Sequence, residues 1–249
     1  MKDQNNPILL IHGAWEGAWS WNKTIKLLRE KGHVVDAIDL PGHGDDKTPI
    51  AEIDLTLYVN HVKEELRKRA GKVVLVGHSF AGFVFARVAE EMPEKIEKMV
   101  FIASAIPYDG KSAMEVFEED KKSEFLENLI ISEDKSYATM SRETILNIVF
   151  TGATEDQLDE ILPQLVPQAL APFMENIVTT KANFGSVPKA YVETTLDRVI
   201  SLDHQRYVQQ RNGITESVTL EYGHVPLETA PEALADALDT IFSSTNSIV

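Results

Sequence analysis

The chain has 249 residues, of which 43% are hydrophobic and 25% are charged, as in an ordinary globular protein. The formal net charge of −15 argues against binding to nucleic acid or to an anionic membrane surface, because both repel an acidic protein. The absence of cysteine excludes a disulfide framework and a metal site built from thiolates.

The first part of the chain alternates short apolar runs with amphipathic segments. Met1 to Asn6 is polar and the first apolar run is only as long as a strand, so we expect no signal peptide, no membrane span and a cytoplasmic location. Apolar runs predict strands, and apolar residues spaced by three or four predict helices. The predicted strands are 7–11, 33–40, 72–76 and 98–104, and the predicted helices are 19–31, 55–69 and 83–91.

The same alternation returns near the end of the chain. Strands are predicted at 189–194 and 217–222, and helices at 203–211 and from about 231 to 242. Repeated alternation with fully apolar strands is typical of a parallel sheet that is covered by helices on both faces. The predicted fold class is therefore α/β.

Residues 106–187 interrupt this alternation. They contain helix-like stretches at 113–129, 142–149 and 155–162 but no convincing core strand. The segment is too long for a simple connection, and it follows the carboxyl end of a strand, where open α/β sheets place their ligand sites. We predict a core of residues 1–105 and 188–249 with a mostly helical cap at 106–187; the alternative is a second domain unrelated to the chemistry.

Ser79 lies where an apolar run meets a helical segment. The run ends in Gly77-His78-Ser79-Phe80-Ala81-Gly82, a turn of the G-x-S-x-G kind in which Ala81 replaces the second glycine. Glycine lets the backbone turn sharply where a Cβ would clash, so the turn lifts the serine hydroxyl above the end of the strand. The strand, turn and helix together predict a nucleophile elbow rather than a serine in an ordinary loop.

An elbow serine needs an acid and then a histidine further along the chain. His224 follows the strand 217–222 through a short turn and is the predicted general base, whereas His204 lies at the start of a predicted helix. Asp197, three residues after the strand 189–194, is the predicted acid, which holds the imidazole tautomer. Asp109, after the strand 98–104, is the alternative acid.

Two backbone N–H groups are expected to stabilise the oxyanion. One belongs to Phe80 at the start of the helix, and the other belongs to Ala14 in the loop after the first strand. Trp15 in the same loop is a candidate substrate-binding residue. His12 and His78 are expected to brace the loops beside these groups.

Three glycine-rich motifs carry a family resemblance. Residues 12–21 read H-G-A-W-E-G-A-W-S-W, residues 39–44 read D-L-P-G-H-G, and residues 77–82 read G-H-S-F-A-G. With the stretch around Asp197 and the turn before His224, they resemble the branch of the α/β-hydrolases that contains hydroxynitrile lyases, plant salicylate-methylesterase-like enzymes and bacterial esterases. The resemblance is weakest in the cap. It implies an α/β-hydrolase fold, a serine nucleophile, a small apolar pocket under a helical cap, and no cofactor or metal.

The predicted function is a serine hydrolase that cleaves a small, largely apolar carboxylic ester through an acyl-enzyme. A small-molecule ester is then the expected partner, and a homodimer is left open. The alternatives are a C–C bond hydrolase, a hydroxynitrile-lyase-like enzyme or a non-catalytic receptor on the same fold. The lyases that the chain resembles have threonine and lysine where this chain has Gly13 and Val225, and dehalogenases and epoxide hydrolases call for aspartate at the position of Ser79.

Overall fold

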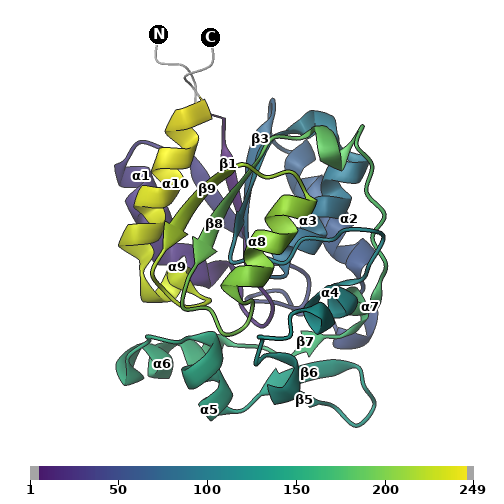
Figure 1. Cartoon of the computed structure of the whole chain (residues 1–249), viewed down its shortest axis with the longest axis vertical. Coiled ribbons are helices and arrows are strands. Elements are labelled where there is room, and N and C mark those ends of the chain that lie inside the picture. Colours follow the sequence, from purple (N-terminus) through teal and green to yellow (C-terminus); the bar gives the residue numbers. More distant parts are fainter. Residues whose placement is uncertain (1–5, 246–249) are drawn as a thin grey trace.

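A six-stranded parallel sheet forms the centre of the protein in the computed structural model, which describes residues 6–245. Figure 1 shows the sheet between two layers of helices. The strands Ile8–Ile11 and Val73–His78 at its centre are almost wholly apolar and almost wholly buried, as a parallel sheet covered on both faces requires. The strand order is β2 (Val35–Ile38), β1 (Ile8–Ile11), β3 (Val73–His78), β4 (Ile96–Ile102), β8 (Lys189–Thr194) and β9 (Glu216–Leu220).

The register brings the carboxyl ends of these strands to one edge. Ile11 at the end of β1 pairs with Gly77 near the end of β3, and Thr194 of β8 pairs with Leu220 of β9. The loops that follow β1, β3, β8 and β9 therefore leave the sheet on the same side. All four candidate site segments from the sequence are on these loops.

Helices cover both faces of the sheet (Figure 1). On one face α1 (Asn22–Glu30) packs against α10 (Pro231–Thr245), and on the other α2 (Leu55–Arg67) packs against α3 (Ala81–Glu91), beside α8 (Leu202–Arg211). Asp54 caps the start of α2: its carboxylate accepts a hydrogen bond of 2.7 Å from the Leu57 N–H and so satisfies a free donor of the first turn. The predicted α/β class is confirmed.

Most of the chain between β4 and β8 lies at the edge where those strands end, and its last part, after Met174, runs back past α3 to the start of β8 (Figure 1). It contributes no strand to the main sheet and instead forms a separate three-stranded antiparallel sheet, which the sequence analysis did not predict. Its elements are α4 (Ala113–Glu119), β5 (Leu129–Ile131), β6 (Tyr137–Met140), α5 (Arg142–Thr144), α6 (Glu155–Ile161), β7 (Gln168–Ala169) and α7 (Ala171–Met174).

The helix predicted over 113–129 ends at Glu119. The next residue, Asp120, turns away and accepts hydrogen bonds of 2.7 Å from both the N–H and the hydroxyl of Ser201. This contact with the loop before α8 ends the helix, and residues 129–131 become strand β5 instead. A bond between residues 81 positions apart leaves no local signal in the sequence.

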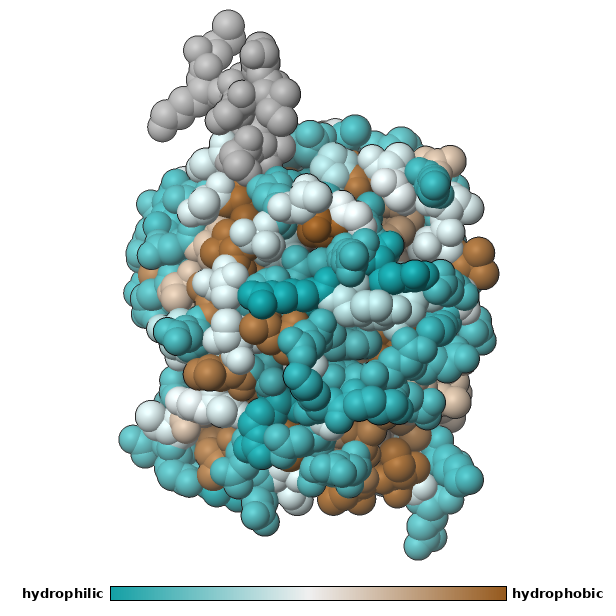
Figure 2. All heavy atoms as spheres, viewed as in Figure 1, coloured by the Kyte–Doolittle hydropathy of each residue, from teal (hydrophilic) through white to brown (hydrophobic). Residues whose placement is uncertain are grey.

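The surface is mostly hydrophilic on the face drawn in Figure 2, with a hydrophobic area low in the view, at the end where β5 and β6 lie. β5, at this end of the molecule, exposes Ile130 and Ile131. Across residues 6–245, every helix is too short or too polar to span a lipid bilayer.

Candidate active site

Ser79 sits in a strained turn between β3 and α3. Its φ is +51°, in the left-handed region that a non-glycine residue rarely adopts. Gly77 and Gly82 make the turn possible: a Cβ on Gly77 would lie 2.5 Å from the Phe85 ring, and one on Gly82 would lie 2.3 Å from the carbonyl oxygen of Ala105. The two glycines thus allow α3 to pack closely on the sheet.

The imidazole of His224 lies between Ser79 and Asp197. Its Nε2 is 2.9 Å from the Ser79 Oγ, and its Nδ1 is 2.8 Å from Asp197 Oδ2. All three residues are at most 8% exposed. Nδ1 therefore donates to the carboxylate, and Nε2 is free to accept the proton of the serine hydroxyl. The short turn at residues 222–223 is long enough for this contact.

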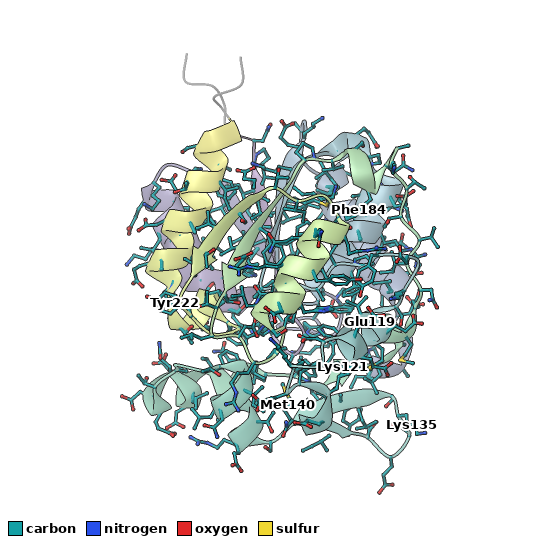
Figure 3. The ribbon with its side chains drawn as sticks, in the orientation of Figure 1. Glu119, Lys121, Lys135, Met140, Phe184 and Tyr222 are labelled. Atoms are coloured by element: carbon teal, nitrogen blue, oxygen red, sulfur yellow. The ribbon has the colours of Figure 1, made fainter. Side chains whose placement is uncertain are left out.

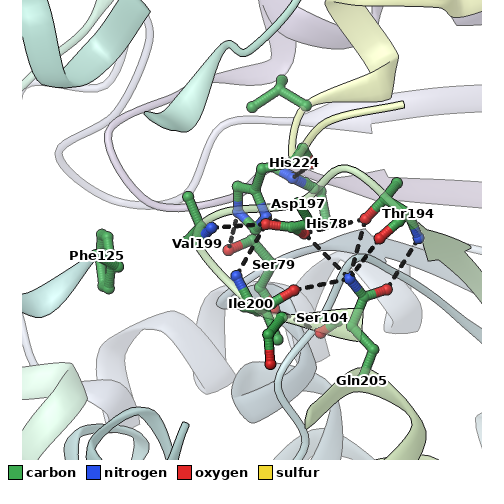
Figure 4. A network of polar contacts seen from close by, with 12 residues as sticks. His78, Ser79, Ser104, Phe125, Thr194, Asp197, Val199, Ile200, Gln205 and His224 are labelled. Carbon is green, nitrogen blue, oxygen red and sulfur yellow. Dashed lines mark hydrogen bonds and ion pairs between the residues drawn. The ribbon is translucent and has the colours of Figure 1, made fainter. Parts of the chain in front are cut away.

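The carboxylate of Asp197 is fixed by further hydrogen bonds, which Figure 4 shows. Oδ1 accepts the N–H groups of Val199 and Ile200 at 2.8 and 2.9 Å. Oδ2, which faces His224, also accepts the Thr194 hydroxyl at 3.0 Å and the Gln205 amide at 3.3 Å. These donors stabilise the ionised carboxylate and hold it in one orientation.

The alternative acid and base lie elsewhere. Asp109 forms an ion pair with Arg211, and its side chain is 58% exposed. His204 is on α8, where burial lowers the pKa of its imidazole. The structure thus brings Asp197 and His224 to Ser79. Asp109 and His204 lie elsewhere.

Ala14 and Phe80 both line the cavity that Ser79 also lines, and their backbone N–H groups are the predicted oxyanion donors. Neither donates to another group among residues 6–245, although the neighbouring N–H of Gly13 bonds to Glu16 and that of Ser79 bonds to Ile102. Their role as oxyanion donors stays a prediction, and N–H groups without a partner within the protein are what that role requires.

Trp15 holds the loop of Ala14 against the segment 106–187. Its φ is +64°, and its indole N–H donates to the Ala138 carbonyl at 2.8 Å. Its backbone N–H donates to the Gln168 side chain at 3.4 Å, and its carbonyl accepts the Val166 N–H at 3.0 Å. These bonds stabilise a backbone conformation that is strained in isolation.

A mostly apolar cavity opens over Ser79, and Trp15 lines it. Phe80 stacks on Phe173 with ring centroids 4.1 Å apart, and Trp15 meets Phe125 edge to face at 5.6 Å. Met140 on β6, labelled in Figure 3, is one of several lining residues that cannot be predicted from the sequence, because no periodic pattern links these residues to one another. The lining from segment 106–187 consists of Phe117, Phe125, Met140, Val149, Phe150, Leu165 and Phe173.

Comparisons with known proteins fit this architecture. The profile of the alpha/beta hydrolase family matches residues 8–237. Methylesterase 2 of Arabidopsis thaliana is 32% identical over 249 aligned positions, which cover 92% of this chain and 93% of that protein. Putative methylesterase 11, chloroplastic, from the same plant is 30% identical over 93% of this chain, which spans 62% of that longer protein.

The fold is also shared with solved structures. Polyneuridine aldehyde esterase superposes with a TM-score of 0.84 at 24% identity, and the match covers 96% of this chain and 99% of that one. The resemblance inferred from the sequence motifs is confirmed. The chain belongs to the alpha/beta hydrolase family, in the branch that holds the plant methylesterases.

Proposed function

We propose that this protein is a carboxylic ester hydrolase that uses Ser79, His224 and Asp197 as a catalytic triad. The observation that carries the proposal is the unbroken row of contacts from the Ser79 hydroxyl through both ring nitrogens of His224 to Asp197. Methylesterases among its relatives support the same chemistry. The proposal needs no cofactor, because serine, imidazole and backbone donors suffice for acyl transfer.

In the first half of the reaction, Ser79 attacks the ester carbonyl while His224 takes its proton. The carbonyl oxygen becomes an oxyanion, and the N–H groups of Ala14 and Phe80 stabilise it. Asp197 stabilises the imidazolium that forms. The imidazolium then protonates the leaving alcohol, and the acyl group remains on the Ser79 oxygen.

In the second half, water replaces the alcohol. His224 removes a proton from the water, which attacks the acyl carbonyl and regenerates the oxyanion beside the same N–H groups. Collapse of this intermediate breaks the bond to Ser79, and His224 returns its proton to the serine oxygen. The products are a carboxylic acid and the free enzyme.

The substrate is proposed to be a small, largely apolar ester. The cavity is lined mainly by aromatic and aliphatic side chains, and two of its ionisable groups, Glu16 and His78, are bonded to each other. Residues 106–187 supply much of this lining, so we propose that they act as a cap over a core made of residues 1–105 and 188–249. A buried negative charge on the substrate would find no lysine or arginine among the described lining residues.

A matched pair of esters tests the proposed substrate class. The p-nitrophenyl esters of butyric and succinic acid have acyl chains of equal length but differ by one carboxylate. We expect kcat/KM to be about 100-fold or more lower for the succinyl ester, because its charge must be desolvated without a partner. Equal rates for the two esters would contradict an apolar acyl site, and no turnover of any ester in a wider panel would favour a non-catalytic receptor.

Cyanohydrin cleavage is the main competing chemistry, and we expect it to be absent. Cyanide leaves as an anion and needs a cation beside it. Among the described residues that line the cavity there is no lysine or arginine, and the position after His224 is the buried Val225. At Gly13 a Cβ would lie 2.6 Å from His78 Nδ1, so a threonine does not fit there.

Cyanide release from mandelonitrile should therefore stay at the rate of the buffer alone. Lyase turnover that disappears in Ser79→Ala would contradict this expectation. Hydrolysis of a C–C bond uses the same triad, and an activity assay with a β-diketone substrate separates it from ester hydrolysis. The cytoplasmic location and the homodimer left open by the sequence stay predictions.

A further inference from the structure

Glu16 and His78 join three parts of the proposed catalytic site. Glu16 Oε2 accepts the N–H of Gly13 in the oxyanion loop at 2.9 Å, and it lies 2.9 Å from Nδ1 of His78 in the nucleophile turn. On its other side, the His78 ring places Nε2 2.8 Å from the backbone carbonyl of His224. Both side chains are buried, with 3% and 2% exposed. One pair of residues therefore contacts the oxyanion loop, the turn of the nucleophile and the loop of the general base.

Three other buried histidines near this site are satisfied as neutral rings. His12 Nε2 accepts the Leu40 N–H, while its Nδ1 faces the Gly13 carbonyl. In His43, Nδ1 faces the carbonyl of Glu16 and Nε2 faces the hydroxyl of Tyr58, which can donate. His224 likewise faces one carboxylate and one hydroxyl. Each ring needs one proton and one lone pair, which is what a neutral imidazole offers.

His78 differs because both of its ring nitrogens face acceptors. A carboxylate oxygen lies at Nδ1 and a backbone carbonyl oxygen lies at Nε2, and a carbonyl cannot donate. Beside an ionised Glu16, a neutral ring would leave one of these buried contacts without a proton. Only a ring that carries both protons then makes both hydrogen bonds, and the carboxylate balances its charge.

The charges around His78 favour this state. Burial alone would lower the pKa of the imidazole, but the carboxylate of Glu16, the backbone carbonyl of His224 and the more distant Asp197 together raise the pKa of His78 above its ordinary value. The other titratable groups that face the ring are His12 and His224, the latter with its ring centroid 4.8 Å away. Burial lowers the pKa of His12, so it adds no competing positive charge at neutral pH.

We propose that Glu16 and a doubly protonated His78 act as a positioning pair that fixes the Gly13 loop, the Ser79 turn and the His224 loop relative to one another. This inference rests on the proposed function, since it assigns the pair a task in that reaction. Neither residue is a catalytic residue, because both act through the groups they hold. Both N–H groups of His78 are committed, so the ring offers no cation to a leaving group in the cavity.

The pair predicts a pH dependence with a definite sign. Because the pKa of His78 is raised in the folded protein, its contribution to the free energy of unfolding is fully present below pH ~6.5, the ordinary pKa of histidine, and is lost as the pH rises through the folded pKa. Once the ring loses a proton, one of its two bonds breaks and a loop it holds is released. kcat for ester hydrolysis should therefore decline on the alkaline side.

The first test measures the ring directly. In the full-length protein with ¹⁵N-labelled histidine, NMR at pH 7.5 should show both nitrogens of His78 protonated and those of His12 and His43 in neutral rings. Glu16→Gln should leave His78 with a single proton. The matched control is Glu228→Gln, which removes another buried carboxylate that interacts with Glu16 but pairs with Lys23, and it should leave His78 doubly protonated.

The second test uses the pH profile of ester hydrolysis. In Glu16→Gln, kcat at pH 8 should fall by about 10-fold with little change in KM, and the alkaline decline should move to lower pH. In Glu228→Gln the decline should stay where it is in the wild type. A merely structural role for Glu16 would lower activity equally at all pH values.

A single proton on His78 in the wild-type protein at pH 7.5 would overturn the inference, as would an alkaline decline unmoved by Glu16→Gln. If Glu16→Gln does not fold, the NMR spectrum of the wild-type protein still decides the protonation of His78. The NMR measurement needs no turnover, so it also separates failure of this inference from failure of the proposed ester hydrolysis.

Discussion

Replacement of Ser79 by alanine is expected to lower kcat for ester hydrolysis by about 10³-fold or more, because triad residues act as a unit and loss of the nucleophile removes the covalent route. The thermal unfolding midpoint should stay close to that of the wild type or rise slightly, because the substitution removes only a buried hydroxyl group and leaves the turn unchanged. Initial rates with p-nitrophenyl butyrate measure the effect.

Ser186→Ala is the matched control, because this serine is exposed and bonds only to the carbonyl of Asn183 within the described chain. It should hydrolyse the ester at the wild-type rate. A Ser79→Ala variant that keeps a near wild-type rate, after purification that excludes contaminating esterases, would place the chemistry at another site.

The second large effect is expected for Asp197→Asn, which should lower kcat by about 10³- to 10⁴-fold. The surrounding hydrogen bonds explain why. The N–H groups of Val199 and Ile200 both donate to Oδ1, so the asparagine must place its carbonyl oxygen there. Its NH₂ group then points at Nδ1 of His224, which is held in the tautomer that cannot accept the proton of Ser79.

Asp109→Asn provides the comparison for this variant. Asp109 lies on the surface in an ion pair with Arg211, so its replacement should change kcat by less than about twofold. Steady-state rates of the two variants over pH 6–9, with circular dichroism to confirm the fold, decide between the two acids. The reverse order of effects would assign the acid to the loop after β4.

The parts of this site that the sequence predicts are those encoded within a few neighbouring residues. The turn around Ser79 can be recognised because glycines are needed where α3 approaches β3 and the loop after β4 closely. Asp197 and His224 follow from chain order, since each comes just after a strand of the main sheet. Their contact with Ser79 then depends on the parallel register, which places these strand ends at one edge.

The parts that the sequence does not predict depend on contacts between distant segments. Phe173 meets Phe80 across 93 positions, and nothing in the spacing of either residue indicates it. The antiparallel sheet formed by β5, β6 and β7 has strands of two to four residues, which are too short to show a period. The link between Glu16 and His78 spans 62 residues and appears only when the loops after β1 and β3 lie side by side.

The most direct test of the account is to identify the residue that carries the covalent intermediate. A fluorophosphonate should add one phosphonyl group to the wild-type protein, and mass spectrometry should find it on tryptic peptide 73–87, whose single serine is Ser79. Ser79→Ala should take up no label, and Asp197→Asn should take it up far more slowly. Labelling of Ser79→Ala at the wild-type rate, or label on another peptide of the wild-type protein, would contradict the assignment of Ser79 as the nucleophile.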